Sequence, residues 1–391
     1  MKKIPALSPW PVFPSEAIEK VTAVLRSGKV NYWTGQECRL FEKEFAAYTG
    51  TRYAIALANG SVALELALFA LGIEPGDEVV TTCRSFIATA SAIVMRGARP
   101  IFADVDPISQ NITAETIARV LTPRTKAVIV VHLAGWPCEM DPILALAEKH
   151  GISVIEDCAQ AHGAAYKGRK VGSLGDVGAF SFCQDKIMTT GGEGGMITLN
   201  DERLWQRAWA YKDHGRSYDA VYRRNHPPGF RWLHESFGTN WRMTEMQGTL
   251  GRWGLNRLDG WLSRRRENAC LLTENFREIE ALRIAEPPEH VEHAFYKYYV
   301  FVRPEQLPAD WDRKRLLQAL EDRGVPISTG SCGEIYLEQS FQQAGLNPSE
   351  RLPVARSLAD TSLMFLVHPT MDSKQMAWVN QQVRGVFTNM R

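Results

Sequence analysis

The stretch AVIVVHLAGWPCEMDPILALAEKHGISVIED, residues 127–157, decides the fold class of this chain. It opens with an apolar run from Ala127 to Leu133, continues with a helical pattern from Pro142 to Lys149, and closes with an apolar run from Ile152 to Asp157. Two short apolar runs separated by a helix are typical of parallel strands joined by a crossover helix, because such strands are buried on both faces. The stretch therefore predicts a parallel β-sheet covered by helices.

The same alternation of strands and helices continues on both sides of this stretch. It predicts an α/β fold with a mostly parallel central sheet flanked by helices. Ligands of such sheets bind at the carboxyl ends of the strands, so the residues that follow each strand are candidates for a functional site. The further strands are expected at residues 53–57, 78–82, 100–105 and 177–183, and the further helices at 61–71, 87–96 and 114–121.

The C-terminal third of the chain has a different pattern. Tyr296 to Arg303 alternates like a half-buried antiparallel strand, and Asp312 to Arg323 reads as an amphipathic helix. We therefore expect a large domain over residues 1–250, with an N-terminal arm, and a small α+β domain over residues 251–391. The stretch from Arg216 to Thr239 is expected to be a long loop, and loops of this length are usually functional or disordered.

Composition excludes several classes of protein. The chain has 391 residues, of which 45% are hydrophobic, and its net charge is +1, so it has no basic footprint for nucleic acid. Its apolar runs are too short to span a membrane, and the start Met1-Lys2-Lys3-Ile4-Pro5 lacks the apolar stretch of a secretory signal. The seven cysteines form no C-x-x-C pair, and the nine histidines show no metal-ligand spacing. A reduced, cytoplasmic protein without a zinc site is expected.

The ends of two predicted strands carry candidate ligand-binding groups. Ala58-Asn59-Gly60-Ser61 ends one strand and opens a helix, where backbone N–H groups and the helix dipole favour a phosphate. Ser61 is also explained as an ordinary N-cap residue of the helix. Phe86 follows the next strand, and its ring either stacks on a planar ligand or packs in the core.

The strand from Ile152 to Asp157 ends in a carboxylate that needs a partner. An unpaired buried carboxylate is costly, and either a cationic ring nitrogen or the N-terminus of a following helix would satisfy Asp157. Gln160, three residues later, is able to form a hydrogen bond with a ring hydroxyl group.

A single lysine, Lys186, follows the predicted strand from Val177 to Cys183. It precedes the segment Thr189-Thr190-Gly191-Gly192-Glu193-Gly194-Gly195, in which the glycines let the backbone come close to a bound group. A lysine held there suits a Schiff base with a carbonyl cofactor. The alternative is a solvated lysine beside a glycine-rich hairpin.

Together these motifs resemble the DegT/DnrJ/EryC1/StrS family of sugar aminotransferases. The resemblance implies a fold-type-I transferase that depends on pyridoxal phosphate, and it runs from Phe13-Pro14 to His368-Pro369. The residues that carry it are Asp157 with Gln160, Gly163-Ala-x-Tyr166-x-Gly168, Phe180-Ser181-Phe182, Lys186 with its Gly-Glu-Gly-Gly segment, Gly97-x-x-Pro100-x-Phe102-x-Asp104-Val105-Asp106 and Gly238-Thr239-Asn240-Trp241-Arg242-Met243.

The resemblance implies a role for each candidate residue. Lys186 would bind pyridoxal phosphate covalently and carry protons during the reaction, and Asp157 would pair with the ring nitrogen of the cofactor. The remaining cofactor contacts that it implies are a ring stack from Phe86, a contact of Gln160 with the ring oxygen, and phosphate contacts from Gly60, Ser61, Ser181 and, from the other subunit of a homodimer, Asn240.

The resemblance also implies a reaction, in which an amino group moves from L-glutamate to an oxo-sugar for surface polysaccharide or lipopolysaccharide synthesis. The active sites would lie at the interface of the homodimer. A lysine at position 186 argues against the sugar dehydratases related to this family, in which histidine replaces the lysine. A non-catalytic regulator that binds the same cofactor is the alternative from another class of protein.

The sugar that accepts the amino group is left open between two classes. His132-Leu-Ala-Gly-Trp136-Pro-Cys and Phe182-Cys183-Gln-Asp-Lys186 resemble the aminotransferases that convert 3,8-dideoxy-8-oxo-octulosonate to 8-amino-3,8-dideoxyoctulosonate. Most members of the family act instead on nucleotide-linked 3- or 4-ketosugars. The candidate arginines for a diphosphate or a sugar-acid carboxylate, which are equally explained as solvated side chains, are Arg216, Arg223, Arg224 and Arg231.

Overall fold

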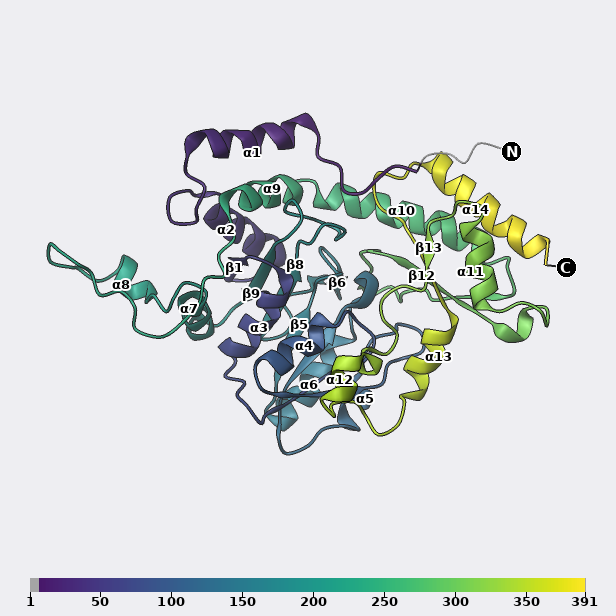
Figure 1. Cartoon of the computed structure of the whole chain (residues 1–391), viewed down its shortest axis with the longest axis horizontal. Helices are drawn as coiled ribbons and strands as arrows, with labels where there is room; N and C mark the ends of the chain where they lie inside the picture. The colour runs from purple at the N-terminus through teal and green to yellow at the C-terminus, as the bar shows by residue number, and fades with distance from the viewer. Residues whose placement is uncertain (1–6, 391) are drawn as a thin grey trace.

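The computed structural model describes residues 7–390. The basic start of the chain, used above to argue against a secretory signal, falls on residues 1–6 and lies outside the described residues, as does residue 391. The centre of the molecule is a seven-stranded sheet of order β1-β9-β8-β5-β4-β2-β3 (Figure 1). Its strands are β1 (Tyr53–Leu57), β2 (Glu78–Thr82), β3 (Arg99–Ala103), β4 (Thr125–Val131), β5 (Ser153–Asp157), β8 (Val177–Ser181) and β9 (Gly195–Leu199).

The prediction of a mostly parallel sheet is confirmed. Strands β3, β2, β4, β5 and β8 pair in parallel. A helix directly precedes each of β2, β3, β4 and β5, whereas β8 follows two short strands in residues 158–176. Only β9 runs against its neighbours, because it returns from β8 through the glycine-rich hairpin and pairs antiparallel with both β8 and β1. The apolar run expected to continue to Leu133 leaves the sheet after Val131, and residues 133–135 form a short 3₁₀ turn instead.

Helices cover both faces of this sheet, as the buried strands require. Alternate residues of each strand belong to different cores: Ile155 packs with one set of helices and Val154 with the other. On the first face lie α3 (Gly60–Ala70), α4 (Ala88–Met95) and α7 (Glu202–Tyr211). On the second lie α2 (Glu37–Thr49), α5 (Ala114–Ala118) and α6 (Met140–His150).

The C-terminal part of the chain forms a second, antiparallel sheet with its own helices and core. Its strand order is β10-β12-β14-β13, and helices α10, α11 and α14 pack on it. The predicted strand from Tyr296 to Arg303 is β12, and the predicted helix from Asp312 to Arg323 contains α11. The bounds are β10 (Leu282–Ile284), β12 (Tyr298–Val302), β13 (Ile327–Ser328), β14 (Ser362–Phe365), α10 (Leu258–Phe276), α11 (Arg313–Glu321) and α14 (Ser373–Thr388).

Shorter elements complete the described chain. A small antiparallel sheet of order β11-β6-β7 lies beside the main sheet, and two helices precede β14. These elements are β6 (Ala165–Tyr166), β7 (Arg169–Lys170), β11 (Val291–Glu292), α12 (Gln339–Gln343) and α13 (Pro353–Thr361). No helix within residues 7–390 is long and apolar enough to cross a membrane.

The N-terminal segment links the two parts of the molecule. After residue 7 the chain runs beside α10 and then forms α1 (Ser15–Ser27), which packs on α9 (Glu245–Leu255) over the large sheet (Figure 1). The division predicted between residues 250 and 251 falls inside α9, a helix that packs on α1 and α2. We propose that the small domain begins after α9, at the start of α10.

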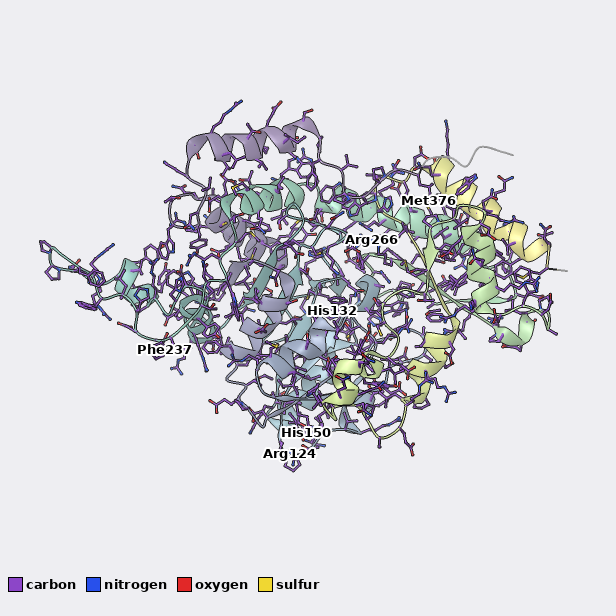
Figure 2. The ribbon with its side chains drawn as sticks, viewed as in Figure 1. Arg124, His132, His150, Phe237, Arg266 and Met376 are labelled. Carbon is purple, nitrogen blue, oxygen red and sulfur yellow. The ribbon has the colours of Figure 1, made fainter. Side chains whose placement is uncertain are left out.

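The segment expected to be a long loop, residues 216–239, contains a short helix, α8 (Tyr218–Tyr222). This segment projects from the body of the molecule beyond α7 (Figure 1), and Figure 2 shows Phe237 at that edge. The prediction missed α8 because the helix has only 5 residues and is stabilised by its cap: the Ser217 hydroxyl accepts from the Ala220 backbone N–H.

Two glycines, one in the central sheet and one in α10, differ in the space available for a side chain. A Cβ on Gly178, in β8, would lie 2.5 Å from the Cα of Gly172, whereas a Cβ on Gly260, in α10, would meet nothing within 4 Å. We expect Gly178→Ala to lower the free energy of unfolding by about 1–3 kcal/mol, because backbone must shift to admit the methyl group. Gly260→Ala is the matched control and should raise it by about 0.5–1 kcal/mol. Chemical denaturation of both variants measures the difference, and equal stabilities would contradict this account.

Candidate active site

A cavity of about 790 Å³ opens at the carboxyl ends of β4, β5 and β8. Val131, Asp157 and Ser181 are the last residues of these strands, and all three line the cavity. The cavity thus lies where the parallel sheet predicts a ligand site. Of the candidate residues, the structure brings together Gly60, Ser61, Phe86, Asp157, Gln160, Ser181 and Lys186, and leaves out Asn240.

Lys186 points its amine into this cavity and is held from behind by the N-terminal arm. The Nζ atom lies 5.0 Å from the centre of the Tyr296 ring. The Trp10 indole N–H donates to the backbone carbonyl of Lys186 at 2.8 Å, and Trp10 itself packs edge-on against Trp261 at 5.1 Å. The backbone of Lys186 is therefore fixed while its side chain faces the cavity. Sequence reasoning missed Trp10 and Tyr296, because each is far from Lys186 along the chain.

Asp157 is a buried carboxylate with hydrogen bonds but no ion pair. Its Oδ2 accepts from the Thr89 hydroxyl at 2.8 Å, and its Oδ1 accepts from the Ala159 backbone N–H at 3.1 Å. No lysine, arginine or histidine within residues 7–390 lies within ion-pair distance of it. Burial raises the pKa of Asp157, and the Thr89 hydrogen bond opposes that shift. Thr89, whose hydroxyl also contacts that of Ser85 at 2.9 Å, was not predicted.

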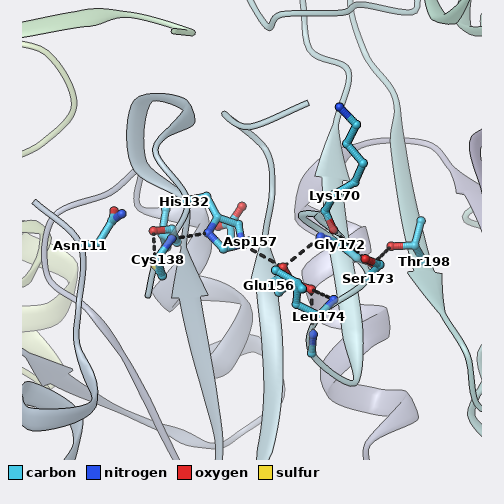
Figure 3. Close-up of polar contacts among 12 residues, drawn as sticks. Asn111, His132, Cys138, Glu156, Asp157, Lys170, Gly172, Ser173, Leu174 and Thr198 are labelled. Atoms are coloured by element: carbon cyan, nitrogen blue, oxygen red, sulfur yellow. Dashed lines mark hydrogen bonds and ion pairs between the residues drawn. The ribbon is translucent and has the colours of Figure 1, made fainter. Parts of the chain in front are cut away.

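Gln160 is oriented by the turn that follows β4. Its side-chain carbonyl accepts from the Ala134 backbone N–H at 2.8 Å, which leaves the amide NH₂ group for a ligand. The turn is fixed by His132, whose Nδ1 accepts from the Cys138 N–H at 3.0 Å and whose Nε2–H donates to Glu156 at 3.0 Å (Figure 3). Figure 2 shows His132 in the middle of the molecule.

Glu156 anchors this network on the other side (Figure 3). Its carboxylate accepts from the backbone N–H groups of Gly172, Leu174 and Gly175 at 2.7–2.9 Å, in addition to His132. His132, Glu156 and Cys158 place ligand-type atoms within 4.8 Å of one another, as in a metal site. Protein hydrogen bonds already use the carboxylate and both ring nitrogens, and burial raises the pKa of the Cys158 thiol. We therefore assign this cluster a structural role.

The opposite end of the cavity suits a phosphate group. The side chain of Asn59 caps α3 by accepting from the Val62 N–H at 3.1 Å, so Ser61 is not the N-cap residue and its hydroxyl faces the cavity. A Cβ on Gly60 would lie 2.5 Å from the Cβ of Ser181, so only glycine allows the helix to start this close to β8. The N-terminus of α3 and the Ser181 hydroxyl therefore meet at one point.

Phe86 lies with the other candidates, whereas Asn240 does not. The Phe86 side chain lines the cavity and is 64% exposed, so the alternative that it packs in the core is wrong. Asn240 is exposed and forms a backbone bridge with Asp213 outside the cavity. Its predicted role concerns a second subunit and stays a prediction.

The arginines of the projecting segment do not line the cavity either. Arg216 lies over the ring of Trp33 at 4.6 Å, Arg223 pairs with Asp219 at 2.9 Å, and Arg224 pairs with Glu235 at 2.7 Å.

The residues present fit pyridoxal phosphate. The buried Asp157 carboxylate lacks a cation, and a protonated ring nitrogen supplies one. Ser61, Ser181 and the N-terminus of α3 are placed for the phosphate, and the exposed ring of Phe86 for stacking. When bound, the cofactor supplies an electron sink for negative charge at the α-carbon of an amino acid.

The hydrogen bond from Thr89 generates a testable prediction. Thr89→Val keeps the shape of the side chain but removes the donor to Asp157, so the pKa of Asp157 should rise further. Because we expect the carboxylate form to pair with the cofactor, the acidic limb of the pH profile of kcat should move to higher pH, with kcat at neutral pH falling about 2- to 10-fold. Thr81→Val, a buried change in β2, is the control. An unmoved acidic limb would count against the role of Thr89.

Comparisons with known proteins show the family of this chain. The family model for the DegT/DnrJ/EryC1/StrS aminotransferase family matches residues 13–384. The crystal structure of an aminotransferase from Psychrobacter cryohalolentis superimposes with a TM-score of 0.97, at 55% identity over 98% of this chain and 100% of that one. The chain is 31% identical to the GDP-perosamine synthase of Escherichia coli O157:H7 over 91% of each protein.

A further relative is the UDP-N-acetyl-3-dehydro-α-D-glucosamine 3-aminotransferase of Acidithiobacillus ferrooxidans. It is 35% identical to this chain and covers 90% of it and 88% of its own length. The match runs through the cofactor cavity and both parts of the fold, and the chain therefore belongs to the DegT/DnrJ/EryC1/StrS family of pyridoxal-phosphate-dependent aminotransferases.

Proposed function

We propose that this aminotransferase moves the amino group of L-glutamate to a nucleotide-linked 3- or 4-ketosugar, with Lys186 as the group that transfers the proton. The observation that carries the reaction is the placement of the Lys186 amine in the same cavity as the buried carboxylate of Asp157. The sugar is inferred from relatives that are named for UDP- and GDP-linked sugars.

The residues of the cavity divide the work. Asp157 holds a proton on the ring nitrogen, which keeps the ring electron-withdrawing. The Nζ atom of Lys186 removes the proton from the α-carbon of the amino donor. The same amine then returns the proton to the cofactor as the amino group is transferred. Tyr296, whose hydroxyl donates to Asp185, presents its ring beneath that amine and limits the positions it can take.

The octulosonate acceptor predicted from the sequence is the second candidate. One of the two segments that suggested it, His132 to Cys138, forms the turn that orients Gln160, and this role concerns the cofactor. That segment therefore carries little information about the acceptor.

We further propose a homodimer that works in the cytoplasm. The projecting segment bears exposed aromatic rings, Phe230, Trp232 and Phe237, and a second copy of the chain would cover such a surface. Asn240 lies at the end of the same segment, where it would reach the site of the partner. All seven cysteines are free thiols, which supports a reducing compartment.

Replacing the catalytic lysine tests the reaction. Lys186→Ala should lower kcat by about 10²–10⁴-fold, because it removes the amine proposed to move the proton. The variant should still bind pyridoxal phosphate, but without the covalent link that borohydride reduction traps in the wild-type enzyme. Lys149→Ala, on the exposed end of α6, is the control. Turnover at the wild-type rate would sink the assignment.

A panel of acceptors tests the sugar. With L-glutamate as donor, we expect amination of UDP-, GDP- or dTDP-linked ketosugars and at least a ~100-fold lower kcat/KM for the same sugars without a nucleotide. Mass spectrometry of the products measures both. Amination of 3,8-dideoxy-8-oxo-octulosonate alone would replace the proposal by the second candidate.

A further inference from the structure

A second cavity, of about 320 Å³, lies next to the one that holds Lys186. The two cavities share three lining residues, Asp185, Tyr296 and Lys297. The other walls of the second cavity come from the N-terminal arm, residues 8–10, and from residues 366–368 after β14, with Arg265 of α10. The second cavity thus joins the small domain and the arm to the reacting end of the first.

Arg265 lines this second cavity with part of its guanidinium group unpaired. The side chain is 1% exposed, and only Nη1 has acceptors, the backbone carbonyls of Phe295 and Tyr296 at 3.4 and 3.2 Å. The Nε and Nη2 atoms have no hydrogen-bond partner within residues 7–390, and the ring of Trp10 lies 5.3 Å from the guanidinium carbon. Burial lowers the pKa of Arg265 to about 9. A buried cation in this state calls for an anionic partner.

The neighbouring charges compensate this cation only in part. Asp185 is the one carboxylate among the residues that line the second cavity, and it already accepts from the Tyr296 hydroxyl and lies 3.6 Å from the Lys297 amine. His368 is neutral near pH 7 and changes this balance by neither sign, because burial and the cations Arg265 and Lys297 lower its pKa to about 4. The second cavity therefore carries two cations against one occupied carboxylate.

We propose that Arg265, assisted by Lys297, binds a carboxylate of the substrate in this second cavity. The proposal rests on the aminotransferase function given above and extends it to a recognition site. Guanidinium groups bind carboxylates through two parallel hydrogen bonds, and Nε with Nη2 is one of the faces that can form such a pair. Each of these atoms exposes less than 1 Å², so a carboxylate reaches this face only when the arm, residues 8–10, moves aside.

The position of the subsite suits a substrate that reacts at Lys186. The amine of Lys186 and that of Lys297 lie 5.0 and 4.7 Å from the centre of the same Tyr296 ring. A carboxylate bound by Lys297 and Arg265 would therefore lie one aromatic ring away from the reacting amine. Two substrates could provide it: the amino donor, through a carboxylate of L-glutamate, or a sugar-acid acceptor.

Binding of glutarate, a dicarboxylate with no reacting group, tests the subsite in the cofactor-loaded protein. Glutarate should raise the Tm of the wild type, and its apparent affinity should fall about 10- to 100-fold in Arg265→Gln. Arg265→Lys, which keeps the charge, should restore part of the affinity. Arg264→Gln, on an exposed side chain that pairs with Glu267, is the matched control and should bind glutarate like the wild type.

Lys297→Gln is a second variant that tests the subsite if Arg265→Gln does not fold. Within residues 7–390 the Lys297 amine pairs with Asp185 and bonds no backbone carbonyl, so its loss should disturb the fold less. Lys297→Gln should lower the apparent affinity for glutarate at least about 3-fold. Equal glutarate affinity in the wild type, Arg265→Lys and Lys297→Gln, or no binding to the wild type, would overturn the proposal.

Separate half-reactions identify the source of the carboxylate. If it belongs to the donor, Arg265→Lys and Lys297→Gln will raise the L-glutamate concentration for half-maximal bleaching of the cofactor, and amination of acceptors by the pyridoxamine-loaded enzyme will not change. If it belongs to the acceptor, only the second half-reaction will weaken, and only for sugar acids. The two failures are distinguishable: an acceptor panel without any aminated sugar removes the proposed function, whereas glutarate binding does not depend on it.

Discussion

The burial of one carboxylate, Asp157, is the constraint on which the rest of the site depends. A parallel strand that is covered on both faces ends at this residue, so water cannot solvate it from either side. The Thr89 hydroxyl and the Ala159 backbone N–H donate hydrogen bonds to this carboxylate. No cationic side chain within residues 7–390 forms an ion pair with it. The protonated ring nitrogen of pyridoxal phosphate would supply the positive charge that this carboxylate lacks.

The neighbouring residue, Glu156, shows the opposite solution on the same strand. Side chains alternate along β5, so Glu156 points to the other face, where His132 and three backbone N–H groups satisfy it completely. That network shapes the turn that aims Gln160 at the cavity. Glu156 thus stabilises the surrounding structure, whereas Asp157, on the opposite face of β5, lines the cavity.

Much of the fold and the centre of the site could be predicted from the sequence. The β-α-β pattern around residues 127–157 is local, and strand ends mark the ligand site, so Asp157, Gln160 and Lys186 could be found. Trp10, Thr89 and Arg265 could not, because their partners are 176, 68 and about 30 residues away along the chain. The short helix α8 was missed for another reason: 5 residues give no period to recognise.

The hydrogen bond between Trp10 and the carbonyl of Lys186 ties the beginning of the chain to its catalytic centre. A ribosome makes this tryptophan long before the lysine, so the hydrogen bond forms only after the chain has been synthesised at least as far as Lys186. Affinity tags and truncations at the amino terminus, usually regarded as harmless, therefore act directly on the active site. Purification tags for this enzyme belong at the carboxyl end, and truncated variants that lack Trp10 will have a less restrained lysine.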